Sequence, residues 1–308
     1  MNNSQITVSV CMITYNHEKY ISKAIEGVLM QNVNFSIELI IGEDCSTDST
    51  RKICVEYKEK YPEKICLLLH NCNLGMQQNF NETLEVCRGK FIAMCEGDDF
   101  WTDPLKLQKQ VDFLEAPEHN EITAIVTNAS VCDLNGYILK SERLVIPPVN
   151  AEGVYFLYDF FKNNHQYPTL TVIFRNKDIN YIISNLKKMS NQFLGDWILW
   201  VLLYQRGSFY FMNQVTASYR INPNSVTHTV NAIKRWEADF TIRKQLIEIL
   251  PIEYQKYLRN NFNTFFKLSM AYRKDKQLLM FVIYQLKSFI ANPLRYLRQM
   301  VDIITKAD

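Results

Sequence analysis

The chain has 308 residues, of which 47% are hydrophobic and 21% charged, enough apolar material for one large α/β domain with a helical appendage. The formal net charge of +2 is too small for binding nucleic acid through overall charge, so no nucleic-acid partner is expected. All eight cysteines lie between Cys11 and Cys132 without zinc-site spacing, which indicates reduced, buried thiols.

Short apolar runs alternate with helical patterns along the first 135 residues. Strands are expected at 6–14, 37–42, 64–70, 91–95 and 122–130. Helices are expected at 17–31, from Ser46–Asp48 to 61, at 76–87 and at 103–114. This alternation predicts βαβ units and a Rossmann-like, mostly parallel sheet with helices on both faces.

The next stretch of the chain is less regular. Asn135 and Gly136 indicate a hairpin turn, and strands at 169–175 and 209–221 are expected on either side of a helix at 196–205. From about residue 230 onward the pattern is helical. Pro251 and Pro293 are expected to divide it into roughly three pieces, which form a C-terminal helical extension.

This extension differs in charge from the rest. Residues 231–308 carry 14 Lys and Arg against 7 Asp and Glu, a net of +7, which leaves −5 for the remainder. Together with apolar positions such as Phe265, Phe266, Tyr284 and Phe289, this charge predicts peripheral contact with an anionic membrane. An ordinary solvated helical face, a helical cap and a dimer surface are the alternatives left open.

The chain shows neither a signal-peptide pattern at its N-terminus nor an apolar run of about 18 residues that could span a membrane. We therefore expect a cytoplasmic protein. If the basic extension does bind lipid, the inner face of the plasma membrane is where it would act.

Polar groups follow four predicted strands at the point where each ends. These groups are Thr14-Tyr15-Asn16, Glu43-Asp44, residues 71–75 and Glu96–Asp99. Because ligands bind at the carboxyl ends of strands in open α/β sheets, we expect a site at this edge.

The sharpest of these groups is acidic. Glu96, Asp98 and Asp99 fall within four residues, and like charges so close need a cation or hydrogen-bond donors to hold them. Oxygen ligands suit Mg²⁺ or Mn²⁺ bridging to phosphate; an acidic turn that caps the next helix is the alternative, although Asp103 already fills that role. Asp44 has no evident structural purpose in the sequence and could accept a hydrogen bond from a nucleobase.

Several ordered motifs resemble the family-two glycosyltransferases, which have a GT-A fold. They are T-Y-N at 14–16, E-D-C-S-T-D at 43–48, N-x-G at 73–75 with Asn79 beyond it, and E-G-D-D at 96–99. The resemblance covers about residues 5–228, and the stretch 95–114 is close to a bacterial branch with an E-G-D-D-[FY]-W-T-D-P segment.

The resemblance implies an enzyme that moves a sugar with inversion from a nucleotide-diphosphate donor, typically a UDP-sugar, to a glycan or lipid-linked acceptor, in bacterial cell-surface polysaccharide synthesis. It implies a GT-A domain at 1–229, with a nucleotide-binding half at 1–135 and an acceptor-binding half at 136–229, followed by the extension at 230–308. The implied nucleotide-sugar-binding residues are Thr14, Tyr15, Asn16, Asp44, Asn73, Gly75, Asn79, Glu96, Gly97 and Asp98.

The same resemblance assigns the chemistry. Asp98, with Glu96 and Asp99, would bind Mn²⁺ or Mg²⁺, and Asp196 in the segment G-D-W would be the catalytic base. A helix N-cap is the plain structural reading of Asp196, and both roles are compatible.

Five positions depart from the family pattern. Glu43 and Glu96 replace the usual first Asp of their motifs, and Cys45 replaces a Gly, so no positive φ is expected there. Gln78 stands where many members have Arg. Asn222 takes the place of a His, and His228 is a candidate substitute.

Other enzyme classes fit less well. A dinucleotide-dependent oxidoreductase needs G-x-G-x-x-G and a P-loop kinase needs G-K-[ST], and neither occurs. A nucleotidyltransferase should carry a Gly- and Arg-rich loop near the N-terminus. A scaffold of this fold without catalysis remains as a rival, but it would be expected to lack Asp98 or Asp196.

Overall fold

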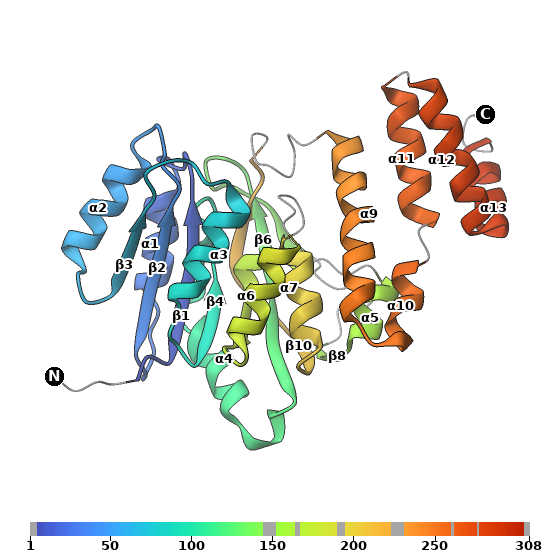
Figure 1. Cartoon of the computed structure of the whole chain (residues 1–308). Helices are drawn as coiled ribbons and strands as arrows, with labels where there is room; N and C mark the ends of the chain where they lie inside the picture. The colour runs from blue at the N-terminus through green and yellow to red at the C-terminus, as the bar shows by residue number, and fades with distance from the viewer. Residues whose placement is uncertain are drawn as a thin grey trace. The chain divides into compact units, whose positions relative to one another are not determined.

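The computed structural model describes residues 5–143, 152–163, 167–189, 195–222, 231–259, 262–275 and 277–304. The chain divides into two compact units, Met1–Asn222 and Pro223–Asp308. The first is an α/β unit and the second is helical (Figure 1).

Ten strands of the first unit form one sheet in the order β3-β2-β1-β4-β9-β6-β10-β5, with β7 beside β6 and β8 beside β10. The strands are β1 (Val8–Thr14), β2 (Ile37–Glu43), β3 (Ile65–Leu69), β4 (Phe91–Met94), β5 (Phe100–Trp101), β6 (Ile122–Cys132), β7 (Ile138–Arg143), β8 (Gly153–Tyr155), β9 (Val172–Arg175) and β10 (Ser208–Arg220). Strands β3, β2, β1 and β4 are parallel neighbours, and β10 is parallel to β6. β9 runs antiparallel between β4 and β6. The predicted Rossmann-like α/β sheet is confirmed, but it is mixed rather than mostly parallel, because β5, β7, β8 and β9 all pair antiparallel with their neighbours.

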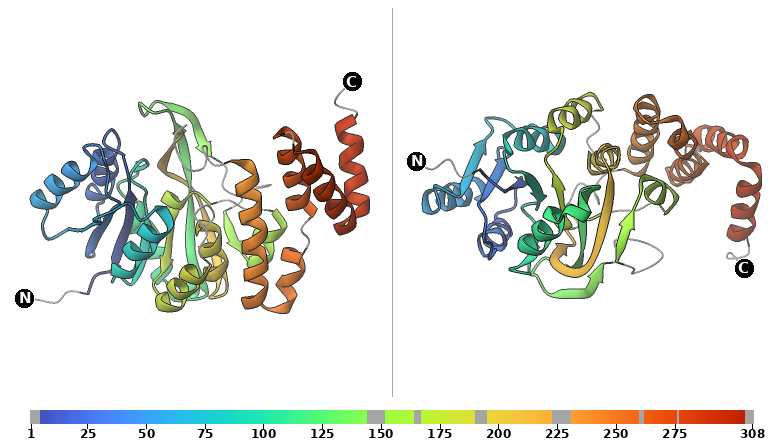
Figure 2. Two further views of the ribbon diagram at one scale, coloured as in Figure 1. Left: turned by 45° about the horizontal axis from the view of Figure 1, so that its top comes forward. Right: turned by 90° about the horizontal axis from the view of Figure 1, so that it is seen from below.

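Helices cover both faces of this sheet. They are α1 (Ile21–Leu29), α2 (Thr50–Lys60), α3 (Met76–Val86), α4 (Lys106–Glu115), α5 (Leu157–Asn163), α6 (Ile179–Lys188) and α7 (Gly195–Tyr204). Figures 1 and 2 show α3, α6 and α7 on one face and α1 and α4 on the other. Residues 103–105 precede α4 rather than belong to it, but Asp103 Oδ1 accepts the Leu105 amide at 2.9 Å and so still caps this turn.

The predicted hairpin lies where expected, since β7 returns antiparallel to β6 after a turn in which Gly136 has φ of +89°. The expected strand at 169–175 is shorter, because Thr169–Thr171 forms a 3₁₀ turn before β9.

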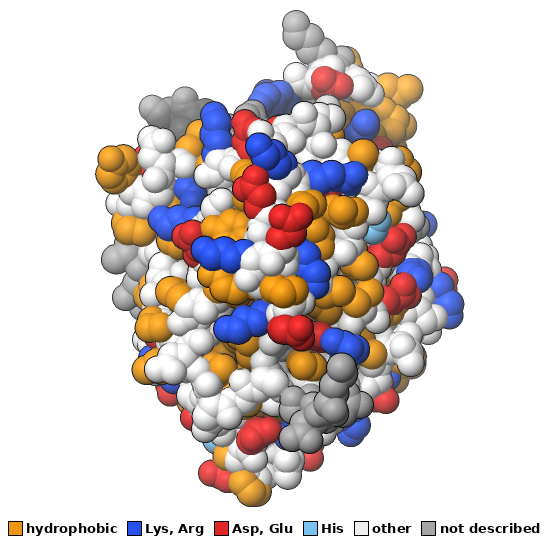
Figure 3. Space-filling model, turned by 90° about the vertical axis from the view of Figure 1, so that its left-hand side faces the viewer, with side chains coloured by type: hydrophobic (Ala, Val, Ile, Leu, Met, Phe, Trp, Pro, Cys, Tyr) orange, Lys and Arg blue, Asp and Glu red, His pale blue; other side chains and the backbone are white. Residues whose placement is uncertain are grey.

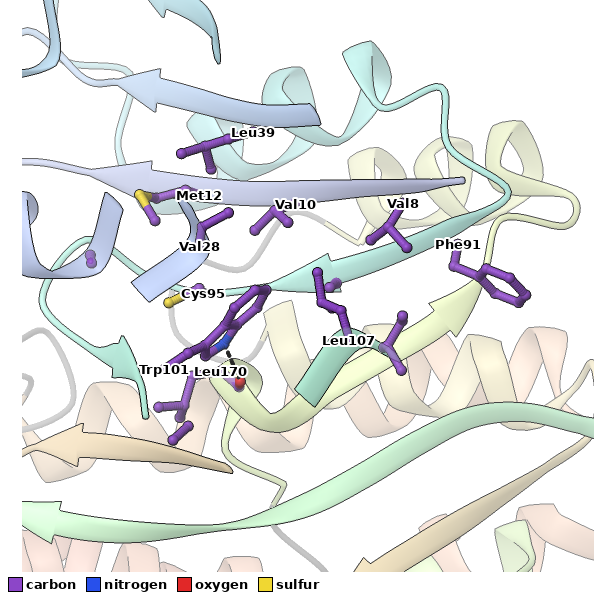
Figure 4. Packing of buried hydrophobic residues seen from close by; sticks show 14 of the residues in the cluster. Val8, Val10, Met12, Val28, Leu39, Phe91, Cys95, Trp101, Leu107 and Leu170 are labelled. Atoms are coloured by element: carbon purple, nitrogen blue, oxygen red, sulfur yellow. Dashed lines mark hydrogen bonds between the residues drawn. The ribbon is translucent and has the colours of Figure 1, made fainter. Parts of the chain in front are cut away.

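Trp101 anchors the acidic segment to the core. Its side chain is packed with Cys95 and Leu107, and its Nε1 donates to the Leu170 carbonyl at 2.8 Å (Figure 4). Gly27 of α1 permits this close packing, because a Cβ there would lie 2.9 Å from the Trp101 backbone nitrogen. The turn at 96–99 is therefore held between buried β4 and buried β5.

Lys106 is fully buried beside this tryptophan. Its Nζ donates to Gln110 Oε1 at 2.8 Å and to the Thr171 carbonyl at 3.3 Å, and it lies 5.0 Å from the Trp101 ring centre. Burial lowers the pKa of Lys106 to about 7, although nearby acidic groups at Cys95 and Asp103 oppose that change.

The Lys106 pKa predicts a pH dependence of stability. The unfolded lysine titrates near 10.5, so between about pH 7 and pH 10 the unfolded state binds the extra proton and the free energy of unfolding rises with pH. Relative to Lys106→Met, the wild type should gain up to about 1.4 kcal/mol per pH unit across this window. Urea unfolding of both proteins at pH 7, 8 and 9 checks this; parallel pH profiles would contradict it.

Charges are mixed on the surface turned toward the viewer in Figure 3, where basic and acidic side chains alternate between apolar ones. This face therefore offers no extended field of one sign.

The second unit contains α9 (Ala232–Ile249), α10 (Ile252–Arg259), α11 (Phe262–Lys274), α12 (Leu278–Ala291) and α13 (Pro293–Ile304). The sequence predicted roughly three helical pieces here, which is too few, because the described part of the unit contains five helices. Pro251 and Pro293 do mark two boundaries, but α10, α11 and α12 are separated without a proline. None of the described helices combines the length and apolar character needed to cross a bilayer.

Aromatic residues form the interior of this helical unit. Tyr272 stacks on Tyr284 at 5.4 Å and donates to Glu237 Oε1 at 2.6 Å, and Phe265 lies 6.1 Å from Tyr284. Phe266 is 6% exposed. The expectation of a membrane contact was therefore wrong for Phe266, which is buried within the unit, whereas Phe265 and Tyr284 are half-buried and it stays a prediction for them.

Candidate active site

The carboxyl ends of β1, β2 and β4 meet at one edge of the sheet. Parallel pairing places Thr14 opposite Glu43, and the Asp44 amide donates to the Thr14 carbonyl at 3.1 Å. The Gly97 amide donates to the Ile13 carbonyl at 3.0 Å. The loops that follow these three strands are therefore adjacent, as the strand-end argument predicted.

The loop after β1 is tied to the loop after β2. Asn16 has a left-handed φ of +56°, and its Oδ1 accepts the Thr47 amide at 2.9 Å. Thr14 is buried, and its hydroxyl lies 3.2 Å from His17 Nδ1. Tyr15, between them, remains 41% exposed. This loop thus presents one aromatic side chain above a fixed backbone.

Asp44 has a clear structural purpose, contrary to the expectation from sequence. Its two carboxylate oxygens accept the backbone amides of Leu74 at 2.7 Å and Gly75 at 3.0 Å. Asn73 Nδ2 donates to the Asp44 carbonyl at 3.1 Å. Asp44, only 2% exposed, therefore fixes the turn from which α3 begins, and the φ of +83° at Gly75 makes that turn possible.

The residues beside Asp44 hold the same loop. Cys45 adopts φ of +58°, so the expectation of no positive φ was wrong: the backbone is left-handed there without a glycine. Glu43 is fully buried, accepts the Ser46 amide at 2.7 Å and pairs with Arg51 Nε. The acidic side chain at Glu43 thus supports the loop from below.

Asn79 lies beneath this edge rather than at its surface. It is 2% exposed, and its Nδ2 donates to the Gly42 carbonyl at 2.9 Å while its Oδ1 lies 3.0 Å from His70 Nε2. Asn79 therefore ties α3 to β2 and acts on the site through the position of α3.

The three acidic residues after β4 have different surroundings. Asp99 is 4% exposed, and its Oδ1 accepts the Arg220 amide at 2.6 Å. The Asp98 carboxylate is 19% exposed, and its Oδ2 lies 3.9 Å from His17 Nε2. Glu96 Oε2 is enclosed and accepts no hydrogen bond from the described residues. Only Asp98 and Glu96 therefore present oxygen atoms without a firm partner.

Desolvation raises the pKa of Glu96 to about 7; a hydrogen bond from Thr169 opposes this rise, and the negative charges of Asp98 and Asp196 add to it. Asp196, from a segment 100 residues further along the chain, is thus near enough to Glu96 for its charge to contribute to that rise.

Asp196 stands in the first turn of α7. It is exposed, and its Oδ1 accepts the Trp197 amide at 2.7 Å, so it also stabilises the helix start. Gly195 before it is buried against Gln77 of α3, and an added Cβ would collide with the Gln77 side-chain oxygen. This close approach places the Asp196 backbone beside the helix that Asp44 positions.

Arg220 is a site residue to which the sequence reasoning gave no role. It is 4% exposed, its Nε donates to the Asp98 carbonyl at 2.8 Å, and its Nη1 donates to the Leu134 carbonyl at 2.8 Å. The available signal was its place in the segment Y-R-I-N at 219–222, which resembles a family motif that ends in His. Asn222 follows β10 and is half-buried, whereas His228 lies outside the described residues.

The donor set fits a hard divalent cation that is completed by a ligand. Within the described part of the chain, no three His, Cys, Asp or Glu side chains gather closely enough to hold a metal by themselves. Mg²⁺-type ions commonly use one or two carboxylates together with substrate phosphates. Asp98 and the enclosed Glu96 Oε2 supply oxygen atoms of this kind, whereas Asp99 is already engaged by Arg220.

The sequence comparisons identify the family of the chain. A family model described as "Glycosyl transferase family 2" matches residues 9–181, so the chain belongs to that family. Rv1520 of Mycobacterium tuberculosis is 32% identical over 232 residues, which are 75% of this chain and 64% of that protein. The chain thus spans somewhat less than two thirds of that relative. TuaG of Bacillus subtilis is 28% identical over 77% of this chain and 86% of its own length.

Solved structures share the fold. TarS from S. aureus in complex with UDP-GlcNAc superimposes with a TM-score of 0.66 at 18% identity, covering 94% of this chain and 83% of that one. The mannosyltransferase PcManGT from Pyrobaculum calidifontis, in complex with GDP-Man and Mn²⁺, gives a TM-score of 0.57 at 13% identity, covering 99% and 81%. The expected GT-A architecture is confirmed.

Proposed function

We propose that this protein transfers a sugar, with inversion, from a nucleotide-diphosphate donor, a UDP-sugar in the first instance, to an acceptor hydroxyl. The observation that carries the proposal is that the loops after β1, β2 and β4 are adjacent at the carboxyl edge of the sheet, with Asp98 at that edge and the Asp196 charge near enough to act on Glu96. A base and a charged diphosphate site are the two parts that such a transfer requires.

The nucleotide would lie over the loops after β1 and β2. The exposed ring of Tyr15 is suited to contact a base, and Thr14 and Asn16 fix its loop. Asp44 would act on the donor through the turn that it holds, since Asn73 and Gly75 border the same edge. Gly97 leaves room there, because a Cβ would lie 2.6 Å from the Thr14 hydroxyl.

The diphosphate end would lie at the acidic turn. Asp98 and Glu96 are the residues that would hold Mn²⁺ or Mg²⁺, and the bound cation would neutralise the charge of the departing diphosphate. His17 Nε2 lies 3.9 Å from Asp98 Oδ2 and Arg220 holds the Asp98 backbone carbonyl, so the backbone of Asp98 is held in place while its carboxylate stays available to a cation. Asp99 contributes by positioning Arg220.

Asp196 would act as the general base. Its carboxylate takes the proton from the acceptor hydroxyl while the acceptor oxygen bonds to the anomeric carbon. The bond from that carbon to the diphosphate oxygen breaks on the opposite side, which inverts the configuration. We assign acceptor binding to residues 136–229. TuaG is named for teichuronic acid biosynthesis, which supports a cell-surface polysaccharide as the product.

A donor panel tests this proposal. Purified protein is heated with UDP-, GDP- and dTDP-sugars, each with Mn²⁺ and with EDTA. A donor at about 100 times its Kd should stabilise the fold by about 2.7 kcal/mol, which shifts Tm by several degrees. We expect one nucleotide class to do so in Mn²⁺. If a folded protein gives no shift with any donor, the proposal is wrong.

A further inference from the structure

The helical unit carries an unusual apolar surface. Six leucine and isoleucine side chains of α12 and α13 are each more than half exposed: Leu278, Leu279, Leu286, Ile290, Leu294 and Leu297. We call this set the α12–α13 surface. Isolated exposed leucines are ordinary, but six of them on two helices that contact each other are typical of an interaction site.

Helical spacing puts these residues on shared faces. Leu279, Leu286 and Ile290 follow one another at intervals of seven and four residues, so they lie along one side of α12. Leu294 and Leu297 are three residues apart on α13. A groove of about 300 Å³ beside them is lined by residues such as Leu286, Phe289 and Tyr296.

The segment that carries the α12–α13 surface is basic. Residues 262–304 carry 7 Lys and Arg against 2 Asp and Glu, whereas residues 231–259 are nearly balanced, with 6 against 4. Lys287 on α12 and Arg295 on α13 are exposed beside the apolar positions. Long basic side chains can keep their charge in the lipid headgroup layer while adjacent leucines enter the acyl boundary.

We propose that the α12–α13 surface binds the surface of an anionic lipid bilayer. The apolar side chains supply buried area, and the surrounding cations pair with lipid phosphates. A second copy of the chain fits the charge less well. A two-fold interface would set this basic surface against itself, and the like charges would repel. The proposal does not depend on which sugar donor the first unit binds.

Vesicle co-sedimentation of the full chain tests the proposal, using phosphatidylcholine vesicles with and without 30% phosphatidylglycerol at low and high salt. We expect binding to the anionic vesicles alone, weakened by salt. Lys287→Glu/Arg295→Glu should reduce the bound fraction about tenfold or more, given the contribution of each basic residue near the membrane. Leu279→Gln/Leu286→Gln/Ile290→Gln should abolish binding, because it removes the apolar contact.

A charge-matched control is available in the first unit. Lys52→Glu/Lys60→Glu changes two exposed lysines of α2 by the same net charge and should leave vesicle binding unchanged. Circular dichroism and Tm identify any variant that fails to fold. Equal binding to neutral and anionic vesicles, or none to either, overturns the proposal. Sedimentation velocity gives a second test. If the wild type is a dimer and the Leu279→Gln/Leu286→Gln/Ile290→Gln variant is a monomer, the surface binds a second copy of the chain and the proposal is wrong.

Discussion

Asp196→Asn is expected to lower kcat by about 10²–10⁴-fold, the usual contribution of a general base. The asparagine keeps the shape of the side chain and an oxygen that can accept the Trp197 amide, but it cannot take the acceptor proton. Steady-state kinetics with a donor that the wild type uses should therefore show a fall in kcat with little change in the KM for the donor. The Tm should stay nearly constant.

Asp103→Asn is the matched control for this variant. Asp103 also holds the start of a helix, and its Oδ1 accepts the Leu105 amide at 2.9 Å. It should cost little activity, which separates loss of a base from loss of a helix-start carboxylate. If Asp196→Asn transfers sugar at close to the wild-type rate when chemistry limits turnover, Asp196 only stabilises α7.

Asp98→Asn is expected to remove most of the gain in UDP affinity that Mn²⁺ or Mg²⁺ provides and to lower kcat by at least about 10–100-fold. The reason is that the Asp98 carboxylate is partly exposed and makes no hydrogen bond within the described residues, and the Glu96 Oε2 of the same turn is likewise without a donor. The fold should persist, because the Arg220 contact uses the Asp98 carbonyl rather than its side chain.

Titration calorimetry with UDP checks the Asp98 prediction in Mn²⁺ and in EDTA. Asp112→Asn, an exposed aspartate on α4, should retain the full effect of the metal. Equal UDP affinity of the wild type in both buffers would rule out a metal at this turn.

The regular elements were predictable because their patterns are local. Strands β1, β2 and β4 are almost continuous apolar runs, as strands buried on both faces should be, and the helices between them show helical spacing. Strand order then placed the polar groups after β1, β2 and β4 at one edge without knowledge of any contact.

The contacts within the site were not predictable because they depend on backbone geometry. The backbone amides of Leu74 and Gly75 that donate to Asp44 point toward it only because Gly75 turns the chain with a positive φ. The left-handed φ of Cys45 reflects that same crowded edge, which overrides the preference of a non-glycine residue. The Arg220 contact joins segments 121 residues apart, which no local pattern records.

The helical unit shows the same limit in another form. Periodicity identified its helices as amphipathic but could not tell which face packs inward. Aromatic residues such as Phe266 and Tyr272 are buried in the interior, and leucines such as Leu279 and Leu294 remain outside. The charge asymmetry was visible in the sequence. Which apolar residues are exposed beside the basic ones could be seen only in the structure.

The central claim is that the protein cleaves a nucleotide-sugar at the carboxyl edge of its sheet, using Asp98 to bind the metal and Asp196 as the base. The most direct test is to measure release of nucleoside diphosphate from the donor that stabilises the protein most. The reaction contains Mn²⁺ and a cell-surface glycan extract as the source of acceptor. We predict that the wild type releases nucleoside diphosphate about 100-fold faster than Asp98→Asn or Asp196→Asn. Equal rates for all three proteins would contradict the account.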